Sequence, residues 1–230
     1  FGLTQALKDV SVTIDEGEVI GLIGENGSGK STLSSIISGV YPQSEGELTL
    51  DGKPYKPADT LDAQNHGISM IAQEMGTLPG IKVADNLFIG KEQLFTKHGV
   101  VDRKKMYQEA RKALEKIGID NIHPEDPIIK YSLEERKLIE VVRALYTNPR
   151  IFIVDETTTA LSQRGRDIIY QVIKNMKKEN KTVLFISHDL EELMEVCSKL
   201  IVLRDGVFVA ELEKSEFEEE KIKELMVCLL

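Results

Sequence analysis

The sequence contains no tryptophan, only two cysteines and four histidines, and no long hydrophobic run. A helix that crosses a bilayer needs about 20 apolar residues, and runs such as Ile151–Val154 and Thr182–Ile186 are much shorter. Two cysteines do not make a disulfide framework, and without a Cys-x-x-Cys pair the sequence shows no zinc site. We therefore expect a chain that does not span a membrane and that works in a reducing compartment.

The sequence is also poor in positive charge. Lys and Arg total 29 against 38 Asp and Glu, which gives a formal net charge of -9. That balance argues against nucleic acid held on a broad basic surface. The 41% hydrophobic and 29% charged residues exclude a disordered chain. The 230 residues suffice for one large domain or two small ones.

Runs typical of strands alternate with helical runs along the chain. The strand-like runs are Val10–Ile14, Glu18–Ile23, Glu47–Leu50, Ile68–Ala72, Ile151–Val154, Thr182–Ile186, Leu200–Leu203 and Val207–Ala210. Helices are predicted at Ser31–Ser38, after an Asp102 cap, at Leu133–Tyr146 and at Gln163–Lys178. From about Val83 to Tyr146 the pattern is mainly helical and predicts no strand. The sequence therefore predicts a mixed α/β core that a helical segment interrupts.

A glycine-rich segment between the second strand and the first helix matches the phosphate-binding pattern G-x-x-x-x-G-K-[ST]. It reads Gly24-Glu25-Asn26-Gly27-Ser28-Gly29-Lys30-Ser31. The glycines let successive backbone N–H groups point at phosphate oxygens, Lys30 adds a positive charge, and Ser31 offers a hydroxyl ligand for Mg²⁺. The alternative is an ordinary glycine-rich turn between a strand and a helix. The predicted nucleotide-binding residues are Gly24, Asn26, Gly27, Ser28, Gly29, Lys30, Ser31 and Thr32.

Two carboxylates follow the apolar strand Ile151–Val154 directly. Asp155 at the strand tip is placed to hold Mg²⁺, and Glu156 is placed to act as general base for an attacking water. The alternative is an acidic pair that caps a helix. After Lys30 and Ser31 the catalytic interpretation is favoured.

With these motifs the sequence resembles an ABC-type ATPase domain, the nucleotide-binding subunit of a membrane transporter. The resemblance covers essentially all 230 residues in order. It implies ATP and Mg²⁺ as cofactors and one P-loop NTPase domain over residues 1–230, with a mixed sheet and a helical subdomain inserted at about 75–148. Ile71-Ala72-Gln73-Glu74 is similar to the family's Q-loop. The resemblance implies that Gln73 contacts Mg²⁺ and the attacking water and signals to the transmembrane partner.

Further segments extend the resemblance. Ile186-Ser187-His188-Asp189 resembles the switch-histidine motif, which implies that His188 contacts the γ-phosphate. Thr159-Ala160-Leu161-Ser162 occupies the D-loop position. Phe1 lies where the family places an aromatic ring that stacks on adenine, although a terminal residue is prone to fraying.

The sequences of several loops resemble those of one subfamily, the tandem ATPases of monosaccharide importers of the ribose and galactose type. Asp85-Asn86-Leu87-Phe88-Ile89-Gly90 is one such loop, and Leu225-Met226-Val227 resembles the point where the first half gives way to the second. The chain is therefore expected to be the amino-terminal half of a longer protein. Its expected partners are a second ATPase domain and transmembrane permease subunits, with no nucleic acid. Its expected place is the cytoplasm, peripheral on the inner face of the cell membrane.

The signature motif of the family is where this sequence departs from the pattern. Tyr131-Ser132-Leu133-Glu134-Glu135-Arg136 stands where the family has L-S-G-G-Q, and Glu134 replaces a glycine that permits close approach to phosphate. Ser132 and Glu135 have the spacing of a helix capping box. We therefore expect the chain alone to be only weakly active as an ATPase, with one hydrolytic site that a partner of opposite pattern completes.

Two alternative functions stay open. One is a soluble relative of the same fold in translation or DNA repair, although no sustained heptads follow Thr32, as a repair-type coiled coil requires. The other is a regulatory module that binds ATP with little hydrolysis. Glu156 and His188 oppose this second alternative, whereas Glu134 leaves it open.

Overall fold

The computed structural model describes residues 5–227, so Phe1 lies outside the described residues. The chain divides into two compact units. The first contains the chain up to Met70, Pro149–Glu156 and the chain from Ile173 onwards. The second contains Ile71–Asn148 and Thr157–Val172. The expected helical subdomain at about 75–148 falls within the second unit; as a domain assignment it remains a prediction.

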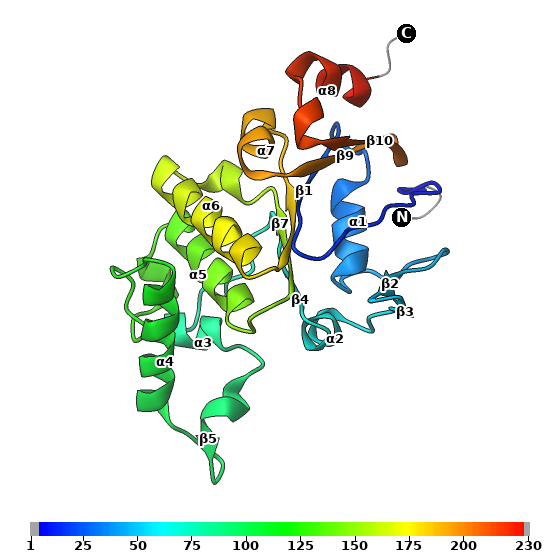
Figure 1. Cartoon of the computed structure of the whole chain (residues 1–230). Helices are drawn as coiled ribbons and strands as arrows, with labels where there is room; N and C mark the ends of the chain where they lie inside the picture. The colour runs from blue at the N-terminus through cyan, green and yellow to red at the C-terminus, as the bar shows by residue number, and fades with distance from the viewer. Residues whose placement is uncertain (1–4, 228–230) are drawn as a thin grey trace. The chain divides into compact units, whose positions relative to one another are not determined.

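A six-stranded mixed sheet forms the centre of the first unit, in the order β10-β9-β1-β8-β7-β4 (Figure 1). Within this sheet β1 runs parallel to β8 and β9, β7 runs parallel to β8, and the β9–β10 pair is antiparallel. The inner strands are continuous apolar runs because both of their faces are buried. The strands are β1 (Val19–Ile23), β4 (Ile68–Ile71), β7 (Ile151–Asp155), β8 (Thr182–Ile186), β9 (Lys199–Arg204) and β10 (Val207–Glu213).

Helices cover both faces of this sheet. Side chains alternate along a strand, so Ile20 and Leu22 join the core cluster that contains Leu33 of α1 (Lys30–Ile37). A Cβ on Gly21, which points to the other face, would lie 2.9 Å from Leu193 of α7 (Leu190–Val196). The unit is completed by α2 (Thr60–Asn65), α8 (Glu219–Met226) and the short pair β2 (Thr49–Leu50) and β3 (Lys53–Pro54).

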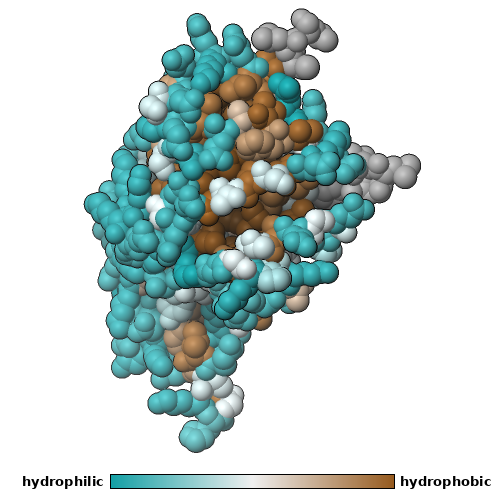
Figure 2. All heavy atoms as spheres, turned by 45° about the vertical axis from the view of Figure 1, so that its right-hand side comes forward, coloured by the Kyte–Doolittle hydropathy of each residue, from teal (hydrophilic) through white to brown (hydrophobic). Residues whose placement is uncertain are grey.

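A cavity of about 760 Å³ lies in the first unit. It is lined by residues 10–16, by residues 47–52 and by inward side chains of the sheet such as Ile153 and Leu184. Figure 2, which brings the side of β2 and β3 forward, shows apolar side chains gathered round a hollow on this face.

The second unit is mainly helical. Phe88 is fully buried at its centre, with its ring 4.6 Å from that of Phe95 and 4.8 Å from that of Tyr146. Asp102 caps α4 as predicted, since its side chain accepts a hydrogen bond from Lys105 N. The elements are α3 (Val83–Leu87), a 3-10 turn (Glu92–Phe95), β5 (Thr96–Lys97), β6 (Val100–Val101), α4 (Arg103–Lys116), a 3-10 turn (Ile128–Lys130), α5 (Leu133–Leu145), a 3-10 turn (Thr158–Ala160) and the start of α6 (Gln163–Lys178).

Two sequence predictions of secondary structure are wrong. Val10–Ile14 shows the alternating burial of a strand, but it belongs to no strand because no strand within residues 5–227 pairs with its backbone. The hairpin β5–β6 lies inside the segment that was expected to lack strands. Within residues 5–227 no helix has both the length and the apolar character that crossing a membrane requires.

Candidate nucleotide-binding site

The glycine-rich loop connects the end of β1 at Ile23 to the start of α1 at Lys30. Three of its glycines have positive φ, and Gly29 is the N-cap residue of α1 with φ 99°. A Cβ on Gly24 would lie 2.0 Å from the Leu203 carbonyl oxygen, so only glycine fits there. The loop therefore curls tightly in front of the N-terminus of a helix, where the helix dipole favours an anion.

The Lys30 ammonium lies inside this curl. The side chain is buried, and Nζ donates hydrogen bonds to the carbonyl oxygens of Gly24 at 2.8 Å and Glu25 at 3.0 Å. Burial lowers the pKa of Lys30, while the carboxylates of Glu156 and Asp155 act in the opposite direction. A positive charge held by two neutral carbonyls is incompletely compensated, so an anionic ligand would be attracted to it.

Asp155 at the end of β7 is joined to α1 by two hydrogen bonds. Its Oδ1 accepts from Ser31 Oγ at 3.3 Å, and its Oδ2 accepts from Ser34 Oγ at 3.0 Å. Burial raises the pKa of Asp155, and the two serine hydroxyls partly oppose that rise. Sequence reasoning missed Ser34; the available signal was its position one helical turn after Ser31.

Glu156 and His188 follow neighbouring parallel strands. Asp155 is in register with Ile186, and Glu156 N donates to Ile186 O at 3.0 Å. His188 comes two residues after β8, which lies between β7 and β1. The carboxyl ends of parallel strands share one sheet edge, where ligands bind in open α/β folds. The fold thus places the glycine-rich loop, Asp155, Glu156 and His188 at the same edge.

The loops that carry Glu156 and His188 have distinctive local geometry. Glu156 has φ 44°, in the left-handed region that a non-glycine residue rarely adopts. The loop with His188 is held by the Ser187 hydroxyl, which donates to Glu192 Oε2 at 2.9 Å and accepts from Asp189 N at 3.0 Å. Asp189 in turn caps α7. These contacts fix the backbone on both sides of His188.

Two of the predicted site residues, Phe1 and Gln73, stay predictions. Phe1 lies outside the described residues, so its adenine contact stays a prediction. Gln73 belongs to the second unit, in the segment after β4, and its contact with Mg²⁺ and water likewise stays a prediction.

The signature segment forms the capping box that its spacing predicted. Ser132 Oγ accepts from Glu135 N at 3.3 Å, and Ser132 N donates to Glu135 Oε2 at 2.9 Å. Glu134 turns instead to the loop before α6, where its Oε1 accepts from Ser162 Oγ at 2.5 Å and from Ser162 N at 3.3 Å. Both carboxylates at the start of α5 therefore have partners within the second unit.

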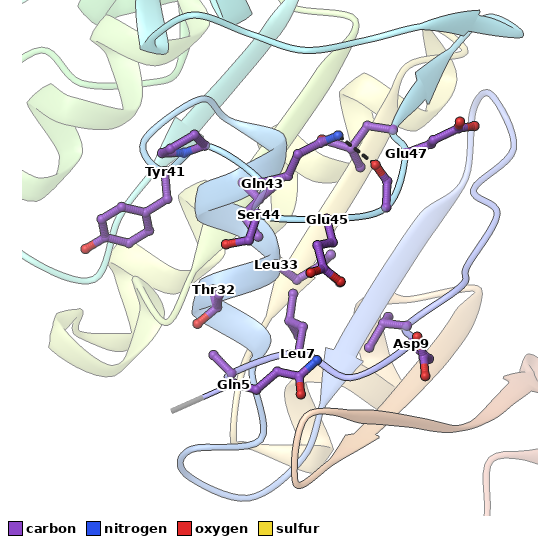
Figure 3. Close-up of a pocket in the computed structure, with 16 residues that line it drawn as sticks. Gln5, Leu7, Asp9, Thr32, Leu33, Tyr41, Gln43, Ser44, Glu45 and Glu47 are labelled. Atoms are coloured by element: carbon purple, nitrogen blue, oxygen red, sulfur yellow. Dashed lines mark hydrogen bonds between the residues drawn. The ribbon is translucent and has the colours of Figure 1, made fainter. Parts of the chain in front are cut away.

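A pocket of about 750 Å³ adjoins the first turn of α1 on the side of Thr32 (Figure 3). Figure 3 shows it between the segment from Gln5 to Asp9 and the loop from Tyr41 to Glu47, and Gln43 Nε2 donates to Gly46 O at 3.0 Å within that loop. The acidic residues Asp9, Glu45 and Glu47 are among those that line the pocket. Like charges repel, so this pocket suits an uncharged part of a ligand better than a phosphate.

The residues present fit a nucleotide phosphate group with Mg²⁺. Ser28 Oγ, in the middle of the loop, is the buried side-chain polar atom within residues 5–227 that has no hydrogen-bond partner. Such a group costs free energy unless a ligand or water satisfies it. Ser31 and Asp155 together supply a hydroxyl and a carboxylate, the oxygen ligands that Mg²⁺ prefers. In the described part of the chain no three His, Cys, Asp or Glu side chains cluster as a dedicated metal site.

These features define a P-loop nucleotide-binding domain with a mixed sheet. The sequence profile of the ABC transporter family matches residues 7–159, and the chain belongs to that family. The fold class and the family resemblance predicted from the sequence are thereby confirmed.

Solved structures of ATP-binding cassettes share the fold. A nucleotide-free cassette from an ABC transporter superposes with a TM-score of 0.83 at 26% identity, covering 99% of this chain and 95% of that one. A cassette in its ADP conformation gives a TM-score of 0.81 at 27% identity, covering 98% and 93%.

Curated relatives align along nearly the whole chain. The ribose import ATP-binding protein RbsA of Caldanaerobacter subterraneus subsp. tengcongensis is 38% identical over 229 residues, which is 99% of this chain and 45% of that protein. The protein of the same name from Shouchella clausii is 39% identical over 227 residues, again 99% and 45%. The chain thus spans less than half the length of these relatives.

Proposed function

We propose that the chain is the ATP-binding subunit of an ABC importer for a simple sugar and couples ATP binding and hydrolysis to transport. The observation that carries the ATPase part is the buried Lys30 ammonium, curled in a glycine loop at the same sheet edge as Asp155, Glu156 and His188. The sugar part rests on the similarity to ribose import ATP-binding proteins.

Each side chain at the sheet edge would have a separate role in phosphoryl transfer to water. Lys30 would exchange its carbonyl partners for the β- and γ-phosphate oxygens, and the backbone of the loop would cradle the phosphates. Glu156 would orient or deprotonate the attacking water, and His188 would stabilise charge on the γ-phosphate. The base and ribose would lie on the side of Thr32, in the pocket of Figure 3.

Mg²⁺ would be held by Ser31, Asp155 and Gln73, and it would neutralise charge on the phosphate oxygens. The Ser31–Asp155 hydrogen bond keeps two of these groups together in its absence. Gln73 would also carry the nucleotide state to a transmembrane partner.

The signature segment makes the isolated chain a weak ATPase in this proposal. Two carboxylates, Glu134 and Glu135, stand at the start of α5 where a partner's γ-phosphate would have to approach. At 4 Å and an effective dielectric of about 20, each like-charge contact costs about 4 kcal/mol before screening. A second ATPase domain with an intact signature, in the same longer chain, would complete the one hydrolytic site that this half supplies.

The full assembly would include transmembrane permease subunits, with this chain bound peripherally at the inner face of the cell membrane and no nucleic acid. The two alternatives are a soluble ABC ATPase of translation or repair and a regulatory ATP-binding module. Co-purification with membranes supports the importer, whereas co-purification with ribosomes supports the translation alternative.

The chemistry is tested with Glu156→Gln. We expect this variant to bind ATP with wild-type affinity, measured by equilibrium dialysis, and to lose at least 100-fold in hydrolysis, because general-base catalysis contributes about 10²–10⁴-fold. Hydrolysis at the wild-type rate would contradict the assignment of Glu156. Absence of ATP binding by the wild-type chain would contradict the proposed function itself.

A further inference from the structure

Helix α5 contains a buried ion pair that the proposed ATPase chemistry does not use. Lys137 and Glu140 have side chains 2% and 4% exposed, and Lys137 Nζ lies 2.8 Å from Glu140 Oε2. Desolvating two charges is costly, and apolar residues of similar volume often stabilise a protein as well or better. A role in stability alone therefore explains this pair poorly.

The Lys137 ammonium is directed at the backbone of the Gln73 segment. Nζ donates to the carbonyl oxygens of Ala72 at 3.0 Å, Gln73 at 3.4 Å and Glu74 at 2.8 Å. An ammonium has three donors and no acceptor, so three successive carbonyls and one carboxylate share all of its hydrogen-bonding capacity.

Two more side chains of α5 continue this contact along the same segment. Glu140 Oε1 accepts from Gly76 N at 2.5 Å, and Arg143 Nη1 donates to Gly76 O at 3.1 Å. Positions 137, 140 and 143 are spaced by three residues and so lie along one face of the helix. We call Lys137, Glu140 and Arg143 the α5 clamp. Every backbone group that it binds lies between Ala72 and Gly76.

We propose that the α5 clamp positions Gln73, with Lys137 as its central positioning residue. Because the contacts are to the backbone of residues 72–76, they set the path of the segment and leave the Gln73 side chain available for its ligand. The segment then moves together with α5, whose first turn carries the signature segment at Ser132. A shift of either end of this helix is transmitted to Gln73. This inference rests on the role of Gln73 in the proposed function.

The test compares variants of the full 230-residue chain. Lys137→Met alone would leave Glu140 as an unpaired buried charge, which by itself is enough to prevent folding. The double variant Lys137→Met/Glu140→Gln removes both charges and keeps an amide oxygen that can accept from Gly76 N. The matched control is Lys112→Met/Glu109→Gln, which removes an exposed ion pair of the same spacing on α4.

Two readouts follow from the proposal. Amide hydrogen exchange within residues 72–76 should become at least about tenfold faster in the double variant, with protection of α4 unchanged. ATP affinity in Mg²⁺ should fall about threefold to tenfold, while affinity in EDTA stays within twofold of wild type. A purely structural role would not produce this dependence on Mg²⁺.

The proposal is overturned if amide exchange of residues 72–76 in the double variant is as slow as in the wild type. It is also overturned if the ratio of ATP affinity in Mg²⁺ to ATP affinity in EDTA does not change. Gln73→Ala separates this failure from that of the proposed function. If Gln73→Ala lowers the affinity in Mg²⁺ and the double variant does not, the clamp is wrong. If Gln73→Ala itself has no effect on that ratio, the proposed role of Gln73 fails, and with it the positioning role.

Discussion

Glu134 Oε1 and Ser162 Oγ are 2.5 Å apart, so the first turn of α5 is fastened to the loop that precedes α6. The same carboxylate lies so close to α6 that a Cβ on Gly165 would come within 2.6 Å of it. In the family pattern this position is a glycine that lets a phosphate approach. Here a carboxylate fills the position and uses it for a contact within the second unit.

Removing the carboxylates of Glu134 and Glu135 should allow this chain to bind a second copy of itself that carries ATP. In a Glu156→Gln background, which retains ATP, we expect Glu134→Gly/Glu135→Gln to shift the chain from monomer towards dimer when ATP is added. The physical reason is that the like-charge repulsion of a triphosphate disappears. Sedimentation with and without ATP measures the shift. Equal dimerisation of the background variant without the two substitutions would contradict the repulsion argument.

Lys30→Met should lower ATP affinity at least tenfold, because the variant lacks the ammonium that the phosphates attract. The fold should persist, since the substitution removes a desolvated charge and not an apolar contact. Equilibrium dialysis and circular dichroism measure the two effects. Lys53→Met, an exposed lysine on β3, is the control and should bind ATP as the wild type does.

The central strands were predictable because their sequences carry the whole signal. Val183–Ile186 is a continuous apolar run, every residue of Thr182–Ile186 is buried, and β8 has these bounds. The run Val10–Ile14 has an equally good pattern, but a strand also needs a neighbour to pair with, which one segment's sequence does not specify. The hairpin β5–β6 was not predictable from hydrophobic periodicity, because each of its strands has only two residues and so shows no alternating pattern. Its signal was His98-Gly99, two consecutive residues with positive φ, as hairpin turns of this type require.

In the candidate site, too, some features were predictable from the sequence and others were not. The glycine loop, Lys30 and Asp155 were predictable because the motif specifies local backbone geometry next to a strand end. The Glu134–Ser162 contact and the α5 clamp were not, since they depend on packing between segments distant in sequence. Residue type alone indicated that Ser132 and Glu135 cap a helix, because a capping box needs only four consecutive residues.

Asp155→Asn should change the pH dependence of stability. Burial holds the pKa of Asp155 above its ordinary value of 3.8. A carboxyl whose pKa is raised on folding favours the folded state while protonated, and that contribution is lost as pH rises through the folded pKa. The asparagine variant, which is always neutral, should therefore melt at higher temperature than wild type at pH 7, and the difference should shrink as the pH falls towards 4.

Thermal melts between pH 4 and pH 7, without Mg²⁺, measure this difference. Adding MgATP should stabilise the wild type and leave Asp155→Asn nearly unchanged, because a metal ligand is lost. If the wild type instead melts above Asp155→Asn at pH 7, with a lead that shrinks on acidification, Asp155 is stabilised by its serine partners more than it is penalised by burial.

Glu156→Gly separates backbone strain from chemistry at one position. At φ 44° a side chain with a Cβ costs about 1–2 kcal/mol that glycine avoids. The greater flexibility of glycine in the unfolded chain offsets part of this gain. We expect a net gain of about 0.5–1 kcal/mol, which raises Tm by ~1–4 °C at this chain length, together with at least a 100-fold loss of hydrolysis.

The control for this variant is Asn180→Gly, with φ 57° in the turn before β8, at the end of the strand opposite to His188. Asparagine tolerates left-handed backbone better than glutamate does, so its gain in Tm should be smaller, and its hydrolysis should match the wild type. If Glu156→Gly does not raise Tm, the position is not strained. If it hydrolyses ATP normally, the left-handed glutamate is a feature of the turn after β7 and not the general base.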